Sequence, residues 1–234
     1  MLEVKHINAY YGRIQALWDV TLRIEEGEIV ALVGANGAGK STTLNVISGL
    51  LHPDSGSIEF LGQRIETLAP QQIIALGISH IPEGRRLFPD MTIKENLELG
   101  AYMSSAWGKR EERIEWIYEV FPVLKARSKQ LAKTLSGGEQ QMLSIGRGIM
   151  TEPKLCMLDE ASYGLSPLMA KNILTVMRKL RDEWMTILLI EQNIKAALAV
   201  ADRAYVMENG RPVLEGTSES LLQNEHVKVA YLGL

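Results

Sequence analysis

The chain has 234 residues, 46% of them apolar, and a formal net charge of −3. This length and composition are enough to bury a sizeable core, and they favour one large domain or one domain with a subdomain. The sequence pI of about 5.9 is not that of a basic nucleic-acid-binding protein, so we expect no nucleic-acid partner.

We expect neither a membrane span nor a secretory signal. The sequence has no run of 18 or more apolar residues, and residues 1–5 alternate like a strand. The single cysteine, Cys156, lies in an apolar run and is typical of a small core residue in a reducing compartment. Any role at a membrane would therefore depend on a partner protein.

The beginning of the chain is rich in predicted strands. Apolar runs predict strands over residues 2–7, 17–24 and 29–33, with a turn at residues 25–27. Residues 54–57, Asp-Ser-Gly-Ser, predict a turn that leads into a strand over residues 58–60. We therefore expect this part of the chain to be mainly β-structure.

A glycine-rich segment follows the predicted strand at 29–33 and fits the pattern GxxxxGK[ST]. Its residues are Gly34, Ala35, Asn36, Gly37, Ala38, Gly39, Lys40, Ser41 and Thr42. In such a segment backbone N–H groups turn toward phosphates, and the following helix adds positive charge at its N-terminus. Lys40 is expected to reach the β- and γ-phosphates, and the Ser41 hydroxyl is expected to bind Mg²⁺. The alternative, an ordinary glycine-rich turn, is disfavoured by the strand before it and the helix after it.

From about residue 91 the pattern becomes helical. Thr92 precedes Glu95 at the spacing of a capping box, and apolar residues recur at helical spacing over residues 114–121. Farther along, Ser136, Gly137 and Gly138 begin another predicted helix, within Leu-Ser-Gly-Gly-Glu-Gln-Gln. Exposed N–H groups at this helix start predict a second anion site. The alternative is the capping turn of a plain helix.

Two acids, Asp159 and Glu160, follow the apolar run at 155–158. The run predicts a buried strand, and ligands bind at the carboxyl ends of strands in open α/β sheets. Asp159 is expected to hold Mg²⁺, and Glu160 to orient or deprotonate the attacking water. An acidic strand end that only starts a turn is the alternative, and the glycine-rich segment disfavours it. The rest of the chain predicts a helix over residues 173–180 and strands over 187–190, 204–207 and 211–214.

With these three motifs, the chain resembles ABC ATPases over essentially its whole length. The resemblance implies an α/β fold: a P-loop NTPase (RecA-like) core with an antiparallel β subdomain and an inserted α-helical subdomain. It implies one ABC ATPase domain over 1–234, with the core at 1–84 and 151–234 and the helical subdomain, carrying the signature motif, at 85–150. It further implies that ATP and Mg²⁺ are the cofactors. Two subunits would close head to tail, so that Ser136, Gly137 and Gly138 of one cap the γ-phosphate held by the other.

Further site residues come from this resemblance alone. Tyr11 stands where the family places an aromatic residue that stacks on adenine, although an ordinary strand-end tyrosine is the alternative. Glu83 stands in place of the usual Q-loop glutamine. A carboxylate beside a phosphate is repelled, so we expect Glu83 to face Mg²⁺, directly or through water, when the dimer closes; the alternatives are pairing with Arg85 or Arg86 and swinging away. Gln192 stands in place of the usual switch histidine and is expected to hydrogen-bond the γ-phosphate, with capping of the next helix as the alternative. Ala161 replaces a common proline, and Ser166 a common aspartate.

The departures at Glu83, Gln192 and Ser166, together with the ending Tyr-Leu-Gly at 231–233, look like the smaller ATPase subunit of the bacterial high-affinity branched-chain amino-acid importer. Ala161 departs from that pattern as well, because proline is again usual there. The resemblance implies a heterodimer with a sister ATPase subunit, although a homodimer is possible in isolation. It also implies two membrane permeases, an indirect periplasmic binding protein, and a peripheral location at the cytoplasmic face of the inner membrane. The alternatives are an ATPase for urea or amide uptake or for lipopolysaccharide export, or a soluble ABC protein of DNA repair or translation. The last would need a coiled-coil insertion or tandem cassettes, which this sequence lacks.

Overall fold

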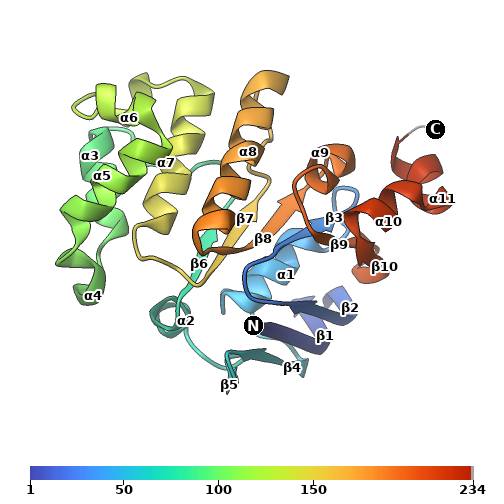
Figure 1. The fold of residues 1–234 in the computed structure, drawn as a ribbon. Helices are drawn as coiled ribbons and strands as arrows, with labels where there is room; N and C mark the ends of the chain where they lie inside the picture. Colours follow the sequence, from blue (N-terminus) through green and yellow to red (C-terminus); the bar gives the residue numbers. More distant parts are fainter. Residues whose placement is uncertain (233–234) are drawn as a thin grey trace.

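The structure is a computed structural model that describes residues 1–232. An antiparallel sheet of four strands, in the order β2-β1-β4-β5, is formed near the N-terminus (Figure 1). Its strands are β1 (Leu2–Tyr11), β2 (Ile14–Ile24), β4 (Ser55–Phe60) and β5 (Gln63–Arg64). The turn expected at 54–57 was wrong, because Ser55 and Ser57 pair with Asn8 and Lys5 of β1. Cross-strand pairing extends β4 over residues whose types favour a turn.

The central sheet has six strands in the order β10-β9-β3-β8-β7-β6. They are β3 (Ile29–Val33), β6 (Ile78–Ile81), β7 (Leu155–Asp159), β8 (Thr186–Glu191), β9 (Arg203–Glu208) and β10 (Arg211–Thr217). All neighbouring pairs are parallel except β9 and β10. Strands β3, β7 and β8 are buried along their whole length, as apolar strands covered on both faces should be. The pattern did not predict β6, which carries Ser79 and His80 in only four residues.

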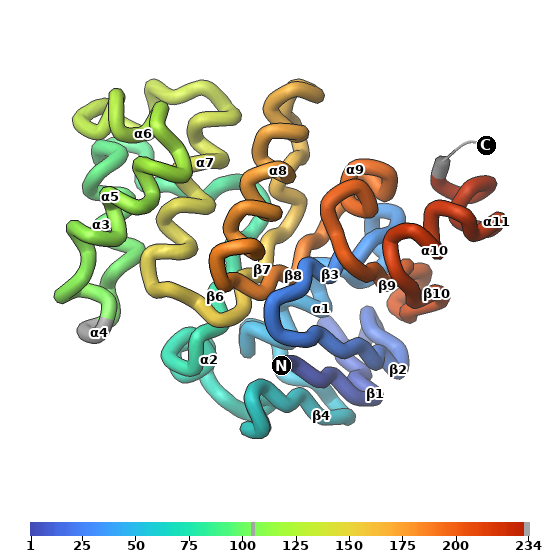
Figure 2. The backbone as a smooth tube through the Cα atoms, viewed as in Figure 1, coloured from blue at the N-terminus to red at the C-terminus, as the bar shows by residue number. Residues whose placement is uncertain are grey.

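Five α-helices lie between β6 and β7 in the sequence. They are α3 (Ile93–Gly100), α4 (Ser104–Trp107), α5 (Arg110–Val120), α6 (Pro122–Ala126) and α7 (Gly137–Ile149), with a short 3₁₀ helix at Ala132–Thr134. Because β6 and β7 are adjacent parallel strands, these helices form an insertion between neighbouring strands. Figure 2 shows the insertion, in green to yellow, on the left of the molecule. The capping box of Thr92 and Glu95 is confirmed, whereas the subdomain limits at 85 and 150 stay predictions.

The remaining helices lie outside this insertion. They are α1 (Lys40–Ile47), α2 (Pro70–Leu76), α8 (Pro167–Glu183), α9 (Ile194–Leu198), α10 (Ser218–Gln223) and α11 (Glu225–Val227), followed by a π-helical turn at Lys228–Leu232. Successive side chains of β3 point to opposite faces of the sheet. Ile29, Ala31 and Val33 join the core shared with the inserted helices, whereas Val30 and Leu32 join the core shared with α1 and the antiparallel sheet. Both faces of β3 are therefore packed, and its carboxyl end is held in place.

Candidate nucleotide and hydrolysis site

The predicted phosphate loop joins β3 to α1. Its glycines have positive φ angles of 151° at Gly34, 78° at Gly37 and 99° at Gly39, which non-glycine residues rarely adopt. A Cβ on Gly34 would overlap the carbonyl oxygen of Met207 at the end of β9. A Cβ on Gly39 would lie 2.9 Å from Leu17 Cδ2 and 3.1 Å from Gly210 Cα. The loop therefore requires glycine at Gly34 and Gly39 for both conformation and space.

The start of α1 is suited to an anion. Gly39 is its N-cap, the helix has no side-chain cap, and its first turn carries no acidic residue. Its N-terminal N–H groups and the positive end of its dipole therefore lack a side-chain partner of opposite charge. Lys40 is 4% exposed, and its Nζ donates to the carbonyl oxygens of Gly34 and Ala35, at 3.0 Å each. The ammonium group of Lys40 thus lies against the loop that would hold the phosphates.

Two side chains that could bind a metal ion through oxygen lie close together where α1 faces the end of β7. Ser41 Oγ donates to Asp159 Oδ1 at 3.2 Å, and Asp159 is 7% exposed. Burial raises the pKa of Asp159, the charge of Glu83 raises it further, and Ser41 and Lys40 oppose the shift. Hydroxyl and carboxylate oxygens are ligands that suit Mg²⁺, which in such sites also takes phosphate oxygens and water. The residues therefore fit a divalent cation bound beside a nucleotide.

Glu160 follows β7 in a strained conformation, with a φ angle of 48°. Its N–H donates to the carbonyl oxygen of Ile190 on β8 at 3.0 Å. Burial raises the pKa of its carboxyl group, as do the charges of Glu83 and Asp159, while Lys40 lowers it. A carboxylate with a raised pKa is a better proton acceptor, as a general base requires.

A cavity of about 590 Å³ joins these parts. The predicted residues that line it are Asn36, Gly37, Gly39, Lys40, Ser41, Thr42, Glu83 and Glu160. Further lining residues, which the sequence motifs did not indicate, are Ile14, Gln15, Ala16, Tyr163, Asn209 and Gly210. They come from β2, the segment after Glu160 and the β9–β10 turn, which only the fold brings together.

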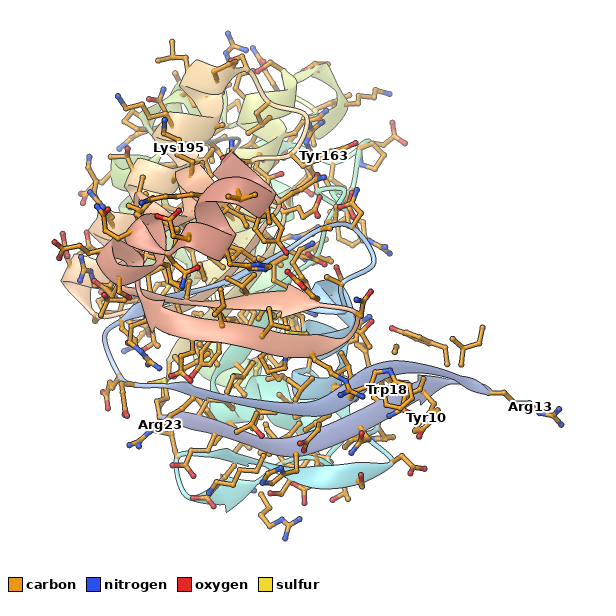
Figure 3. All side chains as sticks on the ribbon, turned by 90° about the vertical axis from the view of Figure 1, so that its right-hand side faces the viewer. Tyr10, Arg13, Trp18, Arg23, Tyr163 and Lys195 are labelled. Carbon is orange, nitrogen blue, oxygen red and sulfur yellow. The ribbon has the colours of Figure 1, made fainter. Side chains whose placement is uncertain are left out.

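Tyr11 lies at the end of β1 and is not among the residues lining this cavity. Tyr11 is 49% exposed, and its hydroxyl accepts from Asn45 Nδ2 on α1 at 3.2 Å. It pairs in register with Ile14, which does line the cavity. Figure 3 shows the hairpin of β1 and β2 in the lower part of the molecule, with Arg13 at its tip, and Tyr163 in the upper part. Stacking of Tyr11 on adenine stays a prediction.

Glu83 follows β6 and lines two cavities, the one above and a neighbouring one of about 450 Å³ that Asp159 also lines. Its charge contributes to the raised pKa of both Asp159 and Glu160, so the three carboxylates are near neighbours. Within residues 1–232, no ion pair joins Glu83 to Arg85 or Arg86; the Arg85 guanidinium donates instead to Gln140 Oε1 at 3.0 Å. This placement supports the metal-facing role that we expect for Glu83.

Gln192 lies outside the phosphate-loop cavity. It lines a neighbouring cavity of about 810 Å³ between α8 and α9, to which Glu160 and Tyr163 also contribute. Figure 3 shows Tyr163 and Lys195, two further residues of this second cavity, in the upper part of the molecule. The following helix is capped by Asn193, whose side chain accepts from the Ala196 N–H at 3.0 Å. The alternative role of Gln192 as a helix cap was therefore wrong, while its contact with the γ-phosphate stays a prediction.

Ser136 is the N-cap of α7. Its Oγ accepts from the Glu139 N–H at 3.4 Å, and Glu139 Oε2 accepts from the Ser136 N–H at 2.9 Å, which completes a capping box. A Cβ on Gly137 would lie 3.0 Å from the Arg85 guanidinium, and one on Gly138 would overlap Met169. None of Ser136, Gly137 and Gly138 lines the phosphate-loop cavity of the same chain. A phosphate contact from this helix would therefore have to serve another subunit.

Comparison with known proteins identifies the family. Residues 17–163, which include the phosphate loop, Glu83, the α7 start and the pair Asp159–Glu160, match the ABC transporter family. The chain belongs to this family. The expected fold class and ATPase activity are thereby confirmed.

Relatives and solved structures agree with this assignment. The chain is 46% identical over 233 residues to the high-affinity branched-chain amino acid transport ATP-binding protein BraG of Pseudomonas aeruginosa, covering 100% of both. It is 34% identical to the lipopolysaccharide export system ATP-binding protein LptB of Escherichia coli, covering 96% of this chain and 93% of LptB. Its fold matches the ADP conformation of MJ1267, an ATP-binding cassette of an ABC transporter. That match has a TM-score of 0.86 and 30% identity and covers 100% of this chain and 99% of MJ1267.

Proposed function

We propose that this ABC ATPase powers the import of branched-chain amino acids through partner permeases. The observation that carries the proposal is the 46% identity over full length to a relative whose name gives that transport role. The residues of the ATPase site do not specify the transported molecule, so the proposed substrate rests on this likeness. The residues of the site catalyse the ATP hydrolysis that drives transport.

In the proposed reaction, the α1 N-terminus and Lys40 hold the ATP phosphates. Ser41 and Asp159 hold Mg²⁺, with Glu83 facing it, and the bound cation neutralises charge that develops on the phosphates. Glu160 orients the attacking water and accepts its proton. Gln192 donates a neutral hydrogen bond toward the γ-phosphate, and Tyr11 stacks on adenine.

A second ATPase subunit completes the site. Ser136 and its two glycines lie away from the phosphate-loop cavity of their own chain, so we assign them to the nucleotide of the partner. The partner is proposed to be a sister subunit, with a homodimer possible in isolation. Among residues 1–232, the structure contains no helix with the length and apolar character that a bilayer crossing requires. We propose, from the likeness to a transport ATP-binding protein, that the subunits lie at the cytoplasmic face of the inner membrane, held by two permeases that receive substrate from a periplasmic binding protein.

The permease contact is proposed to lie on residues 85–96. The buried Asn96 holds this loop, since its Nδ2 donates to the carbonyl oxygens of Phe88 and Thr92 at 3.0 Å each and its Oδ1 accepts from the Phe88 N–H. Phe88 itself is 48% exposed and lies over the Arg147 guanidinium, 5.5 Å from ring to cation. Substituting Phe88 should uncouple transport while leaving basal ATP hydrolysis largely unchanged.

The test is reconstitution in liposomes of the chain with its sister subunit and both permeases. With the binding protein and labelled leucine on the opposite side, ATP should drive leucine uptake. Glu160→Gln should bind ATP yet lose roughly 10²- to 10⁴-fold in hydrolysis, whereas Lys40→Ala should lose nucleotide affinity itself. Uptake of urea, or release of lipopolysaccharide in place of leucine uptake, would support an alternative transporter. The 34% identity to LptB makes the lipopolysaccharide assay the first alternative to run.

A further inference from the structure

A buried carboxylate links the segment after Glu160 to strand β8. Glu191 is 2% exposed, and its two oxygens accept different donors of Ser162. The Ser162 N–H donates to Oε1 at 2.9 Å, and the Ser162 hydroxyl donates to Oε2 at 2.7 Å. Ser162 stands two residues after Glu160, and Glu191 stands one residue before Gln192. One side chain thus joins the two segments that carry these residues.

The strained backbone at Glu160 explains why hydrogen bonds are needed to join the two segments. Strands β7 and β8 run parallel up to the pair Asp159 and Ile190, and Glu160 then leaves the sheet with its φ angle of 48°. A non-glycine residue in this region is strained and persists only where its surroundings hold it. The bond from the Glu160 N–H to the Ile190 carbonyl holds one side of the turn. The two bonds from Ser162 to Glu191 hold the other side.

We propose that Glu191 is a positioning residue for ATP hydrolysis, which fixes the Glu160 carboxylate relative to Gln192 through its paired hydrogen bonds to Ser162. The proposal rests on the proposed role of Glu160 as the base. Glu160 and Gln192 line the same cavity of about 810 Å³, so their separation depends on how the two segments are joined. A small displacement of a reacting group can cost about 10²-fold in rate. Neither Glu191 nor Ser162 lines the phosphate-loop cavity, so ATP binding there should not depend on this link.

Substitutions at Glu191 separate geometry from charge and from folding. In Glu191→Gln, the amide oxygen still accepts from the Ser162 N–H, and the NH₂ group donates to the Ser162 hydroxyl oxygen. Glu191→Leu removes both bonds and leaves the Ser162 donors without this acceptor. Ser162→Ala removes the hydroxyl bond and retains the N–H bond. These variants form a graded series in the number of bonds that join the two segments.

The experiment measures steady-state ATP hydrolysis and nucleotide affinity for the full chain with its sister subunit. We expect Glu191→Gln to stay within about threefold of the parent, Ser162→Ala to lose about threefold to tenfold in kcat, and Glu191→Leu to lose about 10²-fold. KM and nucleotide affinity should change less than about threefold in all three variants, because the phosphate contacts remain.

Several outcomes would overturn the proposal. Parental kcat in Ser162→Ala is one, and this variant keeps the test valid if Glu191→Leu does not fold. A loss in Glu191→Gln as large as that in Glu191→Leu would assign the effect to charge instead of hydrogen-bond geometry. A parallel loss of nucleotide affinity would indicate a general structural role. Glu160→Gln is assayed alongside: if it hydrolyses ATP at the parental rate, the assignment of the base fails, which is a separate result from failure at Glu191.

Discussion

Replacing Gly34 by alanine should destabilise the protein far more than the same change at Gly37. A Cβ at Gly34 would overlap the Met207 carbonyl oxygen and lie 3.2 Å from its carbonyl carbon, and both atoms belong to a buried strand end that cannot move freely. Overpacking of this kind costs about 1–3 kcal/mol, and a φ angle reserved for glycine adds about 1–3 kcal/mol. We therefore expect Gly34→Ala to lose about 4 kcal/mol of unfolding free energy. Gly37 has a positive φ angle but open space around it, so Gly37→Ala should lose about 1 kcal/mol.

The assay is urea unfolding of both variants and the parent without nucleotide, followed by tryptophan fluorescence. Gly37→Ala is the matched control, because it makes the same chemical change in the same loop. Gly34→Ala should unfold at a clearly lower urea concentration than Gly37→Ala, with a similar m-value. Equal midpoints for the two variants would refute the claim that close approach to β9, and not the φ angle alone, requires Gly34.

Three further predictions concern polar residues. Glu83→Gln should keep ATPase activity within about tenfold but change its Mg²⁺ dependence, and superimposable Mg²⁺ titrations would show that Glu83 points elsewhere. Gln192→Ala should slow hydrolysis, whereas Gln192→His should stay active and acquire a pH-dependent limb between about pH 6 and 7; parental turnover of the alanine variant would exclude the phosphate contact. Burial raises the pKa of Glu191 to about 6 despite its two bonds from Ser162, so the folded state retains a proton that the unfolded state has released. The stabilising effect of this bound proton is complete below about pH 4.5 and is lost as the pH rises through 6. Over this range the parent should therefore lose about 2 kcal/mol of unfolding free energy relative to Glu191→Gln. Urea midpoints of the two proteins at pH 4.5 and 7 measure that difference, and a constant difference would contradict it.

The phosphate loop is the part of the site that the sequence predicts best. Its residues are consecutive, and the loop conformation follows from glycine positions between a buried strand and a helix. The contact of Ser41 with Asp159 was also predictable, because two parallel strands that end at the same sheet edge bring their following residues together. The local sequence pattern was sufficient to predict the loop, and a general rule of sheet topology was sufficient to predict the contact of Ser41 with Asp159.

Other parts depend on packing that no local pattern encodes. Serine and glycine favour a turn at residues 55–57, yet pairing with β1 makes them a strand. The resemblance predicts a contact of Gln192 with the γ-phosphate, which stays a prediction, whereas the cavity that Gln192 lines between α8 and α9 is formed only by the fold. The link from Glu191 to Ser162 depends on the register of β7 and β8. Its only sequence signal is an acid at the end of an apolar strand, the same pattern that singled out Asp159.

The charges around the site indicate why nucleotide and metal should bind together. Glu83 raises the pKa of both Asp159 and Glu160 and shares a cavity with each of them, and Lys40 opposes these shifts. A carboxylate about 6 Å from a phosphate charge is repelled by about 3 kcal/mol at an effective dielectric of 20. Polyphosphate entering without a cation would meet this repulsion from several side chains, with Lys40 still bonded to the loop carbonyls. A divalent cation between Asp159 and the phosphates turns the same carboxylates into favourable neighbours, so ATP affinity should fall steeply when Mg²⁺ is chelated, and less steeply in Glu83→Gln.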